Sequence, residues 1–218
     1  MTSPKASYPQ LSDSELVALA KKRDLGAWET LITRYEGRVY SLAMRMLRQS
    51  QDAEDVTQQT FLNVMEHLDG FRGDSQFSTW LLRIATHAAL KVIRKRKGLR
   101  TVSLEESTQV DESTDQIPHP EYIASWKEIP EQLLQSQELK DLLDEALSEL
   151  DEKYRIVFLL RDVEGLSIRE TAEAISQSEA NTKVRLLRAR LQLREKLTRV
   201  LGDPATVLHH DHNHGGNG

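Results

Sequence analysis

Apolar residues recur at steps of three and four along most of this chain, and this spacing constrains the fold more than any other feature. In the first third of the chain the repeat is carried by Leu31, Ile32, Tyr35, Val39, Leu42, Ala43 and Met46. This spacing places the residues on one side of an α-helix. No stretch alternates apolar and polar residues as a half-buried strand does. The chain is therefore predicted to be all-α.

Two more helices are predicted before residue 97. The first begins with acidic residues, which suit a helix N-terminus. Its inner face is predicted to hold Phe61, Leu62, Val64, Met65 and Leu68. Residues 69–78, "DGFRGDSQFS", contain two glycines and read as a loop. The apolar repeat resumes at Trp80 and runs into the basic segment "KVIRKRK" at 91–97.

A change of composition divides the chain. Residues 98–136 mix Ser, Thr, Pro and acids without a sustained repeat, although Tyr122, Ile123 and Trp126 could dock on a surface. The helical repeat returns in 137–201, and a His-rich tail follows at 202–218. We predict two helical domains, 1–97 and 137–201, that fold separately and are joined by a flexible acidic linker. A protease should cut this linker first.

Charge is distributed in blocks. Residues 1–97 hold 15 Lys and Arg against 11 Asp and Glu, whereas residues 98–150 hold 3 against 13. Residues 151–201 are basic again, with 11 against 8, although the whole chain has a formal net charge of -5. Two basic blocks around an acidic one indicate a polyanion partner, and solvated helix faces are the alternative.

A helix-turn-helix is predicted in residues 167–197, "SIRETAEAISQSEANTKVRLLRARLQLREKL". Ser167 and Glu170 fit a capping box, and Ser178 can cap the second helix after a turn at 176–178. Val184, Leu187 and Leu191 form an apolar stripe on that helix, with basic residues on both flanks. Such a helix can enter the major groove of DNA, and packing in a bundle or binding an acidic protein is the alternative.

Several classes of function have little support. The chain has 0 Cys, which fits a reducing compartment, and it has neither a signal-peptide core nor an apolar run of membrane-span length. We therefore expect a cytoplasmic protein. No phosphate-binding glycine loop, HExxH pair or cysteine nucleophile occurs, so neither an enzyme nor a cofactor is predicted. The histidines of the tail "HHDHNHGGNG" could bind a metal, but an unstructured tail or an expression remnant is favoured over a metal site.

Two blocks of the chain resemble bacterial extracytoplasmic-function (ECF) sigma factors. The segments "AWETLITRYEGRVYSLAMRML" and "DAEDVTQQTFLNVMEHLDGFRGDSQFSTWLLRIATHAALKVIRKRK" resemble the N-terminal domain of that family. The segment "LSELDEKYRIVFLLRDVEGLSIRETAEAISQSEANTKVRLLRARLQLREKL" resembles the promoter-reading C-terminal domain. The resemblance implies a non-enzymatic factor that binds core RNA polymerase and promoter DNA, with an anti-sigma factor as a further partner.

The resemblance also implies roles for residues of the first domain. The core polymerase is expected to bind Asp52, Asp55, Gln58 and Gln59. The loop and following helix are expected to capture a flipped base of the minus-ten element, and this site is formed by Gly73, Asp74, Ser75, Phe77 and His87. His87 stands where the family usually has Asn, so it makes a similar polar contact, changes base preference or is a surface residue. Arg94 and Arg96 are expected to contact DNA phosphates.

In the second domain the resemblance places the minus-thirty-five contacts on the second helix of the helix-turn-helix. Glu179, Asn181, Lys183 and Arg185 are expected to face base edges, and Arg188 and Arg190 to contact the DNA backbone. The turn has Ser176 and Gln177 where many family members have a glycine. The predicted function is promoter-specific initiation in a stress or envelope response. The alternatives are a stand-alone helix-turn-helix regulator and a helical adaptor that binds protein only.

Overall fold

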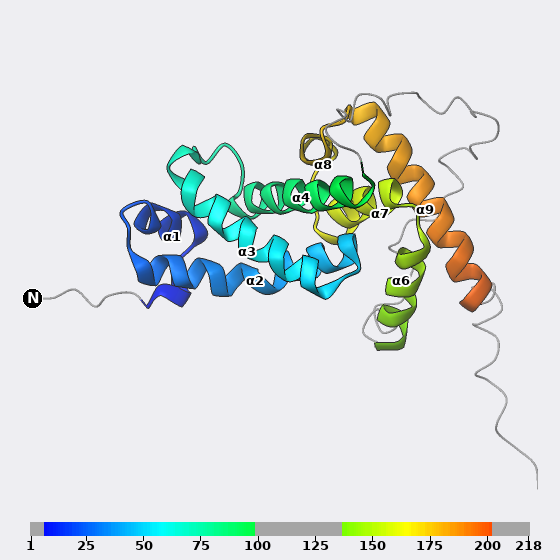
Figure 1. The fold of residues 1–218 in the computed structure, drawn as a ribbon, viewed down its shortest axis with the longest axis horizontal. Helices are drawn as coiled ribbons and strands as arrows, with labels where there is room; N and C mark the ends of the chain where they lie inside the picture. Colours follow the sequence, from blue (N-terminus) through cyan, green and yellow to red (C-terminus); the bar gives the residue numbers. More distant parts are fainter. Residues whose placement is uncertain (1–6, 99–136, 202–218) are drawn as a thin grey trace, which may run out of the picture.

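The computed structural model describes residues 7–98 and 137–201, and every regular element in these ranges is a helix (Figure 1). The predicted all-α class is confirmed. The predicted linker, apart from its first residue, and the His-rich tail lie outside the described residues. The flexibility of the linker and the nature of the tail therefore stay predictions.

Residues 7–98 form the first unit. It opens with the short 3-10 helix η1 (Tyr8–Gln10) and helix α1 (Asp13–Ala20). Three longer helices follow, which are α2 (Leu25–Leu47), α3 (Ser50–His67) and α4 (Phe77–Arg96). The 3-10 turn η2 (Leu68–Gly70) follows α3. Helices α2, α3 and α4 each pack against the other two, and α1 covers α2 (Figure 1).

The ends of these helices follow from local chemistry. Ser12 caps α1 in a reciprocal capping box with Glu15, and Asp24 caps α2 by accepting a hydrogen bond of 3.0 Å from the backbone N–H of Ala27. Arg48 ends α2 in the left-handed conformation, at φ 59°. This reversal of the chain turns it directly into α3.

The core of the first unit confirms the periodicity predicted for α2. Leu31, Tyr35, Val39, Leu42, Ala43 and Met46 are all buried, together with residues of α3 and α4. The prediction for α3 is wrong in part, because Leu62 is 49 % exposed and Met65 is 47 % exposed. Each lies one residue beyond a buried neighbour, Phe61 or Val64, and is therefore turned about 100° away from the core.

Residues 137–201 form the second unit. Its helices are α6 (Gln137–Glu149), α7 (Glu152–Phe158), α8 (Ile168–Ile175) and α9 (Glu179–Leu201). A π-helical turn, η6 (Leu159–Val163), extends α7. Helix α9 packs on α6, α7 and α8, and these contacts hold the unit together.

The predicted helix-turn-helix is present as α8, a short turn and α9. The capping box is confirmed, because the Ser167 hydroxyl accepts from the N–H of Glu170 at 3.1 Å and the Glu170 carboxylate accepts from the N–H of Ser167 at 2.8 Å. Ser176 ends α8 in the left-handed conformation, at φ 55°. Ser178 then accepts a hydrogen bond of 3.2 Å from the N–H of Asn181, as predicted for the cap of α9.

The inner face of α9 differs from the prediction. Val184 is 40 % exposed, and the buried residues of this helix include Leu186, Ala189, Leu193 and Leu197. The predicted stripe and the observed one both repeat at helical spacing, so periodicity cannot choose between them. The contacts of α9 with α6, α7 and α8 determine which of the two faces is buried.

The two units pack against each other. One buried cluster includes Leu42, Met46 and Leu82 of the first unit with Val157 and Leu160 of the second. Helix α8 lies across α4, and α7 lies against α2 (Figure 1). Separate folding of the two domains is not tested by this contact and stays a prediction. No helix within the described ranges is both long and apolar enough to cross a membrane.

Candidate functional site

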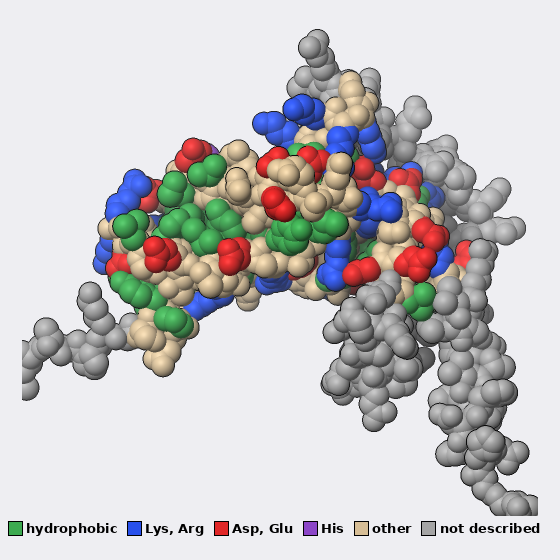
Figure 2. All heavy atoms as spheres, turned by 60° about the horizontal axis from the view of Figure 1, so that its bottom comes forward, with side chains coloured by type: hydrophobic (Ala, Val, Ile, Leu, Met, Phe, Trp, Pro, Cys, Tyr) green, Lys and Arg blue, Asp and Glu red, His purple; other side chains and the backbone are tan. Residues whose placement is uncertain are grey.

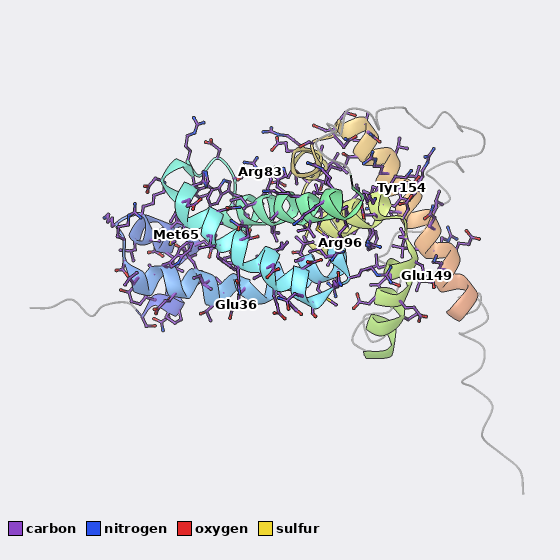
Figure 3. All side chains as sticks on the ribbon, in the orientation of Figure 1. Glu36, Met65, Arg83, Arg96, Glu149 and Tyr154 are labelled. Atoms are coloured by element: carbon purple, nitrogen blue, oxygen red, sulfur yellow. The ribbon has the colours of Figure 1, made fainter. Side chains whose placement is uncertain are left out.

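The outer face of α3 carries exposed polar and apolar side chains in one stripe. Asp55, Gln58 and Gln59 are exposed, as predicted for a partner-binding surface. Leu62 and Met65 are also exposed and continue the same face toward the end of the helix. Met65 is labelled in Figure 3. We call these five residues the α3 stripe. Apolar side chains are also gathered on the face of the first unit seen in Figure 2. An exposed apolar surface rimmed by polar groups is typical of a protein-binding site.

Asp52 belongs to a different environment. It forms an ion pair with Arg96 at the end of α4, and its side chain is 29 % exposed. Arg96 also donates to the backbone carbonyl of Leu47 at 2.8 Å and to the side-chain oxygen of Gln49 at 2.7 Å. Asp52 and Arg96 were predicted to bind polymerase and DNA respectively. The structure joins them in one network that fixes the α2–α3 corner against α4.

The loop before α4 is open to solvent at its tip. Gly73 has φ 82°, a conformation that L side chains rarely adopt, and Asp74 and Ser75 beside it are exposed. The ammonium group of Lys21 donates to the backbone carbonyl of Phe71 at 2.6 Å, which ties the start of the loop to α1. The loop therefore presents polar groups from a fixed base.

Aromatic rings underlie this loop. Phe77, predicted to contact DNA, is only 4 % exposed and contacts Tyr35 edge-on with a ring distance of 5.6 Å. Phe71 and Trp80 are partly buried, and their ring centroids lie 5.0 Å apart. Phe77 therefore supports the site from the core. Phe71 and Trp80, which the sequence analysis did not name as site residues, are the partly exposed rings of this cluster.

His87 lies on α4 where the second unit approaches. The residue as a whole is exposed, and its ring is close to the backbone carbonyls of Glu173 and Ala174 in α8. Burial lowers the pKa of His87, and the nearby Arg83 and Arg94 lower it further, whereas the two carbonyls oppose this shift. The neutral imidazole is therefore favoured. Arg94 is half-buried, and its Nε is buried without a hydrogen-bond partner.

The start of α9 presents some of the predicted base-reading residues and not others. Glu179 and Lys183 are exposed, and the Asn181 amide donates to the side-chain oxygen of Gln177 at 2.6 Å. Arg185 is half-buried, and this burial lowers its pKa. Lys183 is thus the predicted base-reading cation that the described surface presents most openly.

Two arginines of α9 have partners within their own unit. The Arg188 guanidinium donates to the hydroxyl of Tyr154 at 3.3 Å. Arg190 forms a two-point ion pair with Asp162, with N–O distances of 2.8 and 2.7 Å. The hydrogen bonds that Arg190 donates to the Asp162 carboxylate raise the pKa of Arg190. Arg190, predicted to contact the DNA backbone, therefore links α9 to the end of η6.

The sequence matches two family models, one in each unit, and each match includes surfaces described above. Sigma-70 region 2 matches residues 31–98, which include the α3 stripe and the loop before α4. Sigma-70, region 4 matches residues 140–193, which include the helix-turn-helix. The ECF RNA polymerase sigma-E factor of Escherichia coli K12 is 35 % identical over 190 residues, covering 86 % of this chain and 95 % of that protein. The chain belongs to the ECF sigma factors. It is a sigma factor that directs transcription initiation.

Other relatives agree with this assignment. The ECF sigma factor SigW of Bacillus subtilis is 31 % identical over 177 residues, which cover 81 % of this sigma factor and 92 % of SigW. Among solved structures, CnrH in complex with the cytosolic domain of CnrY has a TM-score of 0.55 at 24 % identity, over 86 % of this chain and 97 % of that chain. The sigma factor RpoE of Bartonella quintana, solved with the anti-sigma factor NepR, also has a TM-score of 0.55, at 22 % identity, over 78 % and 96 %. At these identities the solved structures establish the fold.

Four surface residues of the sigma factor were missed as site residues for identifiable reasons. Leu62 and Met65 were assigned to the core because apolar residues at helical spacing usually are. Phe71 and Trp80 were taken as loop and core residues. The available signal for the stripe was the pair Gln58 and Gln59, which lie four and three residues before Leu62 and therefore share its face of the helix. Among the described residues no cluster of three or more His, Cys, Asp and Glu could hold a metal ion.

Proposed function

We propose that this sigma factor binds core RNA polymerase through the α3 stripe. The exposed Leu62 and Met65 beside Asp55, Gln58 and Gln59 carry this proposal. Their apolar area gains free energy when a partner covers it, and the adjacent carboxylate and amides give the partner polar contacts at the rim. Asp52 contributes indirectly, because its ion pair with Arg96 holds the start of α3 in place.

The loop before α4 is the proposed site for a flipped base of the minus-ten element. Gly73, Asp74 and Ser75 supply an open loop with polar groups, and Phe71 and Trp80 supply aromatic faces. Flipping a base costs a few kcal/mol of stacking, and stacking on an aromatic side chain offsets it. Phe77 packs against both rings from the core side. His87 and Arg94 lie farther along α4.

The start of α9 is the proposed reader of the minus-thirty-five element. Ser178 begins the helix, so the exposed Glu179 and Lys183 lie in its first turns, where a recognition helix meets base edges. Asn181 and Arg185 flank them. A stand-alone helix-turn-helix regulator is not favoured, because region 2 of the family is matched in a separate part of the chain.

Three further properties belong to this proposal. The polymerase supplies the chemistry, so the chain itself is proposed to be non-enzymatic. We also propose that it acts in the cytoplasm, where core RNA polymerase and the chromosome are found. An anti-sigma factor is a proposed partner, supported by the structurally similar sigma factor RpoE of Bartonella quintana, which was solved in complex with the anti-sigma factor NepR.

The proposal is tested by selecting DNA from a random library with core polymerase plus this chain. We expect the selected duplexes to share two conserved elements at one fixed spacing, because two separate surfaces are joined in one holoenzyme. Selection of a single conserved element by the chain alone would contradict the proposal and support a stand-alone regulator.

Replacing Trp80 with alanine should weaken binding of a minus-ten single strand by about 1–3 kcal/mol, the usual loss for one stacked base. The measurement is fluorescence anisotropy with the holoenzyme and an oligonucleotide from the selected library. Leu25→Ala, which changes a residue that is 75 % exposed at the start of α2, is the control and should leave affinity unchanged. Equal affinity for Trp80→Ala and the wild type would remove Trp80 from the site.

Lys183→Ala and Arg190→Ala should have different effects. Lys183 is exposed, so its loss should weaken promoter binding by about 1–3 kcal/mol if it contacts a base edge, and less on a mismatched element. Arg190→Ala removes a charge-assisted pair with Asp162 and should lower the free energy of unfolding by about 1.5–3 kcal/mol. Holoenzyme affinity and urea unfolding measure the two effects. If Arg190→Ala left the free energy of unfolding unchanged, the pair with Asp162 would not stabilise the unit. The predicted contact of Arg190 with the DNA backbone would then be favoured.

A further inference from the structure

Lys21, which caps the end of α1, reaches across to the loop before α4. Its ammonium group donates to the backbone carbonyl of Phe71 at 2.6 Å and to that of Asp69 at 3.4 Å. Asp69 lies in η2 and Phe71 directly follows it, so these carbonyls belong to a helical end whose acceptors need a partner from elsewhere. The end of α1 and this loop lie at the same end of the first unit (Figure 1). A charged donor from a distant part of the sequence therefore holds the start of the loop.

The corner between α1 and α2, which carries Lys21, is itself fixed. The backbone N–H of Lys21 donates to the carbonyl of Val17 at 3.0 Å, so this residue completes the last turn of α1. Arg23 then reverses the chain in the left-handed conformation, at φ 66°. Asp24 begins α2 by accepting a hydrogen bond of 3.0 Å from the N–H of Ala27. The ammonium group of Lys21 therefore acts on the loop from a rigid support.

The contact with Lys21 fixes the backbone of a residue that also has an aromatic contact. The ring of Phe71 lies 5.0 Å from that of Trp80. Beyond Phe71, residues 72–76 are all exposed, and the chain returns to the core at Phe77, which is 4 % exposed at the start of α4. The exposed part of the loop therefore takes its shape from its two ends. Without Lys21, one of these ends is released.

Lys21 differs from the two cations that follow it. Lys22 is exposed, and the side chain of Arg23 is 81 % exposed, whereas Lys21 is half-buried with its ammonium group against two carbonyls. Exposed cations beside a DNA site attract phosphates, which carry no sequence information. A short charge-assisted hydrogen bond holds one geometry. Lys21 is therefore suited to fix the shape of the loop, and Lys22 only to add charge.

We propose that Lys21 is a positioning residue of the minus-ten loop and that it determines how selectively the loop accepts a base, without contacting that base. The inference rests on the proposed function, because it concerns the loop assigned there to the flipped base. A loop of fixed shape presents Asp74 and Ser75 at fixed positions, and a base whose hydrogen-bonding groups do not match them is rejected. A loop released at one end adapts to several bases. Loss of Lys21 should therefore lower selectivity among bases.

The test compares Lys21→Met with the wild type as holoenzymes. The probes are minus-ten single strands from the selected library that carry each of the four bases at the position where the wild type discriminates most. Methionine keeps an unbranched side chain but has no N–H to donate. The affinity ratio between the preferred base and the next should fall about tenfold, the factor for a hydrogen bond of about 1.4 kcal/mol. Lys21→Arg keeps a cationic donor and should retain the wild-type ratio.

Lys22→Met removes the same charge one residue away and is the matched control. It should weaken binding of all four strands alike, and this loss should shrink as salt is raised. Amide hydrogen exchange in the free protein gives a second measurement that needs no DNA. Exchange of residues 71–76 should become faster in Lys21→Met and stay unchanged in Lys22→Met, because only the first variant releases the start of the loop.

Two results would overturn the positioning role while leaving the proposed function intact. The first is a Lys21→Met holoenzyme that discriminates among the four bases as well as the wild type does. The second is a loss of affinity that is equal for all four strands and equal to that of Lys22→Met, because Lys21 would then act only through its charge. A wild-type holoenzyme that prefers no base at any position of the strand would instead overturn the proposed function of the loop, whatever the exchange rates are.

Discussion

Phe77→Ala should lower the free energy of unfolding by about 3–5 kcal/mol, the range for removing a buried aromatic ring. Phe77 is 4 % exposed and has rings on three sides, with Tyr35 at 5.6 Å and Phe71 and Trp80 both at 6.0 Å. Alanine leaves a cavity under the loop, and these rings lose their support. Urea unfolding followed by circular dichroism measures the change.

Phe77→Leu provides the control for this prediction. Leucine keeps most of the buried volume, so the loss of stability should be clearly smaller than with alanine. Minus-ten binding by the folded holoenzyme should fall in both variants, because Phe71 and Trp80 are positioned by this side chain. If a Phe77 variant lost DNA binding while its free energy of unfolding stayed unchanged, the supporting role would be contradicted. Direct contact between Phe77 and DNA would then be indicated.

Leu62→Glu should weaken binding to core RNA polymerase by about 2 kcal/mol or more, the loss expected at a central residue of an interface. Leu62 is 49 % exposed and lies between the polar residues of the α3 stripe and Met65. A carboxylate there replaces apolar contact with a charge that the partner must desolvate. Because the side chain is already exposed, the fold should be unaffected. Competition for core polymerase against the labelled wild type measures the loss.

Leu25→Glu is the matched control for Leu62→Glu. Leu25 is 75 % exposed at the start of α2, outside the α3 stripe, so the same change should leave polymerase affinity close to wild type. Equal losses for the two variants would indicate a nonspecific effect of added negative charge. Unchanged affinity for both would remove the α3 stripe from the polymerase interface.

The helices could be predicted because their signals are local. The apolar repeat of α2 identified its buried face, and the pair Ser167 and Glu170 identified the start of α8. Each of these signals involves residues within a few positions of one another, so the spacing of the α-helix is enough to interpret them. The resemblance to ECF sigma factors was needed to predict which segments bind polymerase and which bind promoter DNA.

The side-chain partners could not be predicted, because they join residues far apart in the sequence. Arg96 pairs with Asp52, and Arg190 pairs with Asp162, so two predicted DNA contacts are engaged within the protein. The buried face of α9 and the exposure of Leu62 likewise depend on which helices pack together. Periodicity identifies candidate faces, and tertiary contacts choose among them.

The most direct measurement of the central claim is transcription from a template that carries a promoter selected as above. Purified core RNA polymerase should make a transcript of one defined length only when this chain is present. Leu62→Glu should reduce that transcript in proportion to its loss of polymerase binding, and Leu25→Glu should not. A transcript that is independent of the chain, or that the chain only represses, would contradict the account that this protein directs polymerase to promoters.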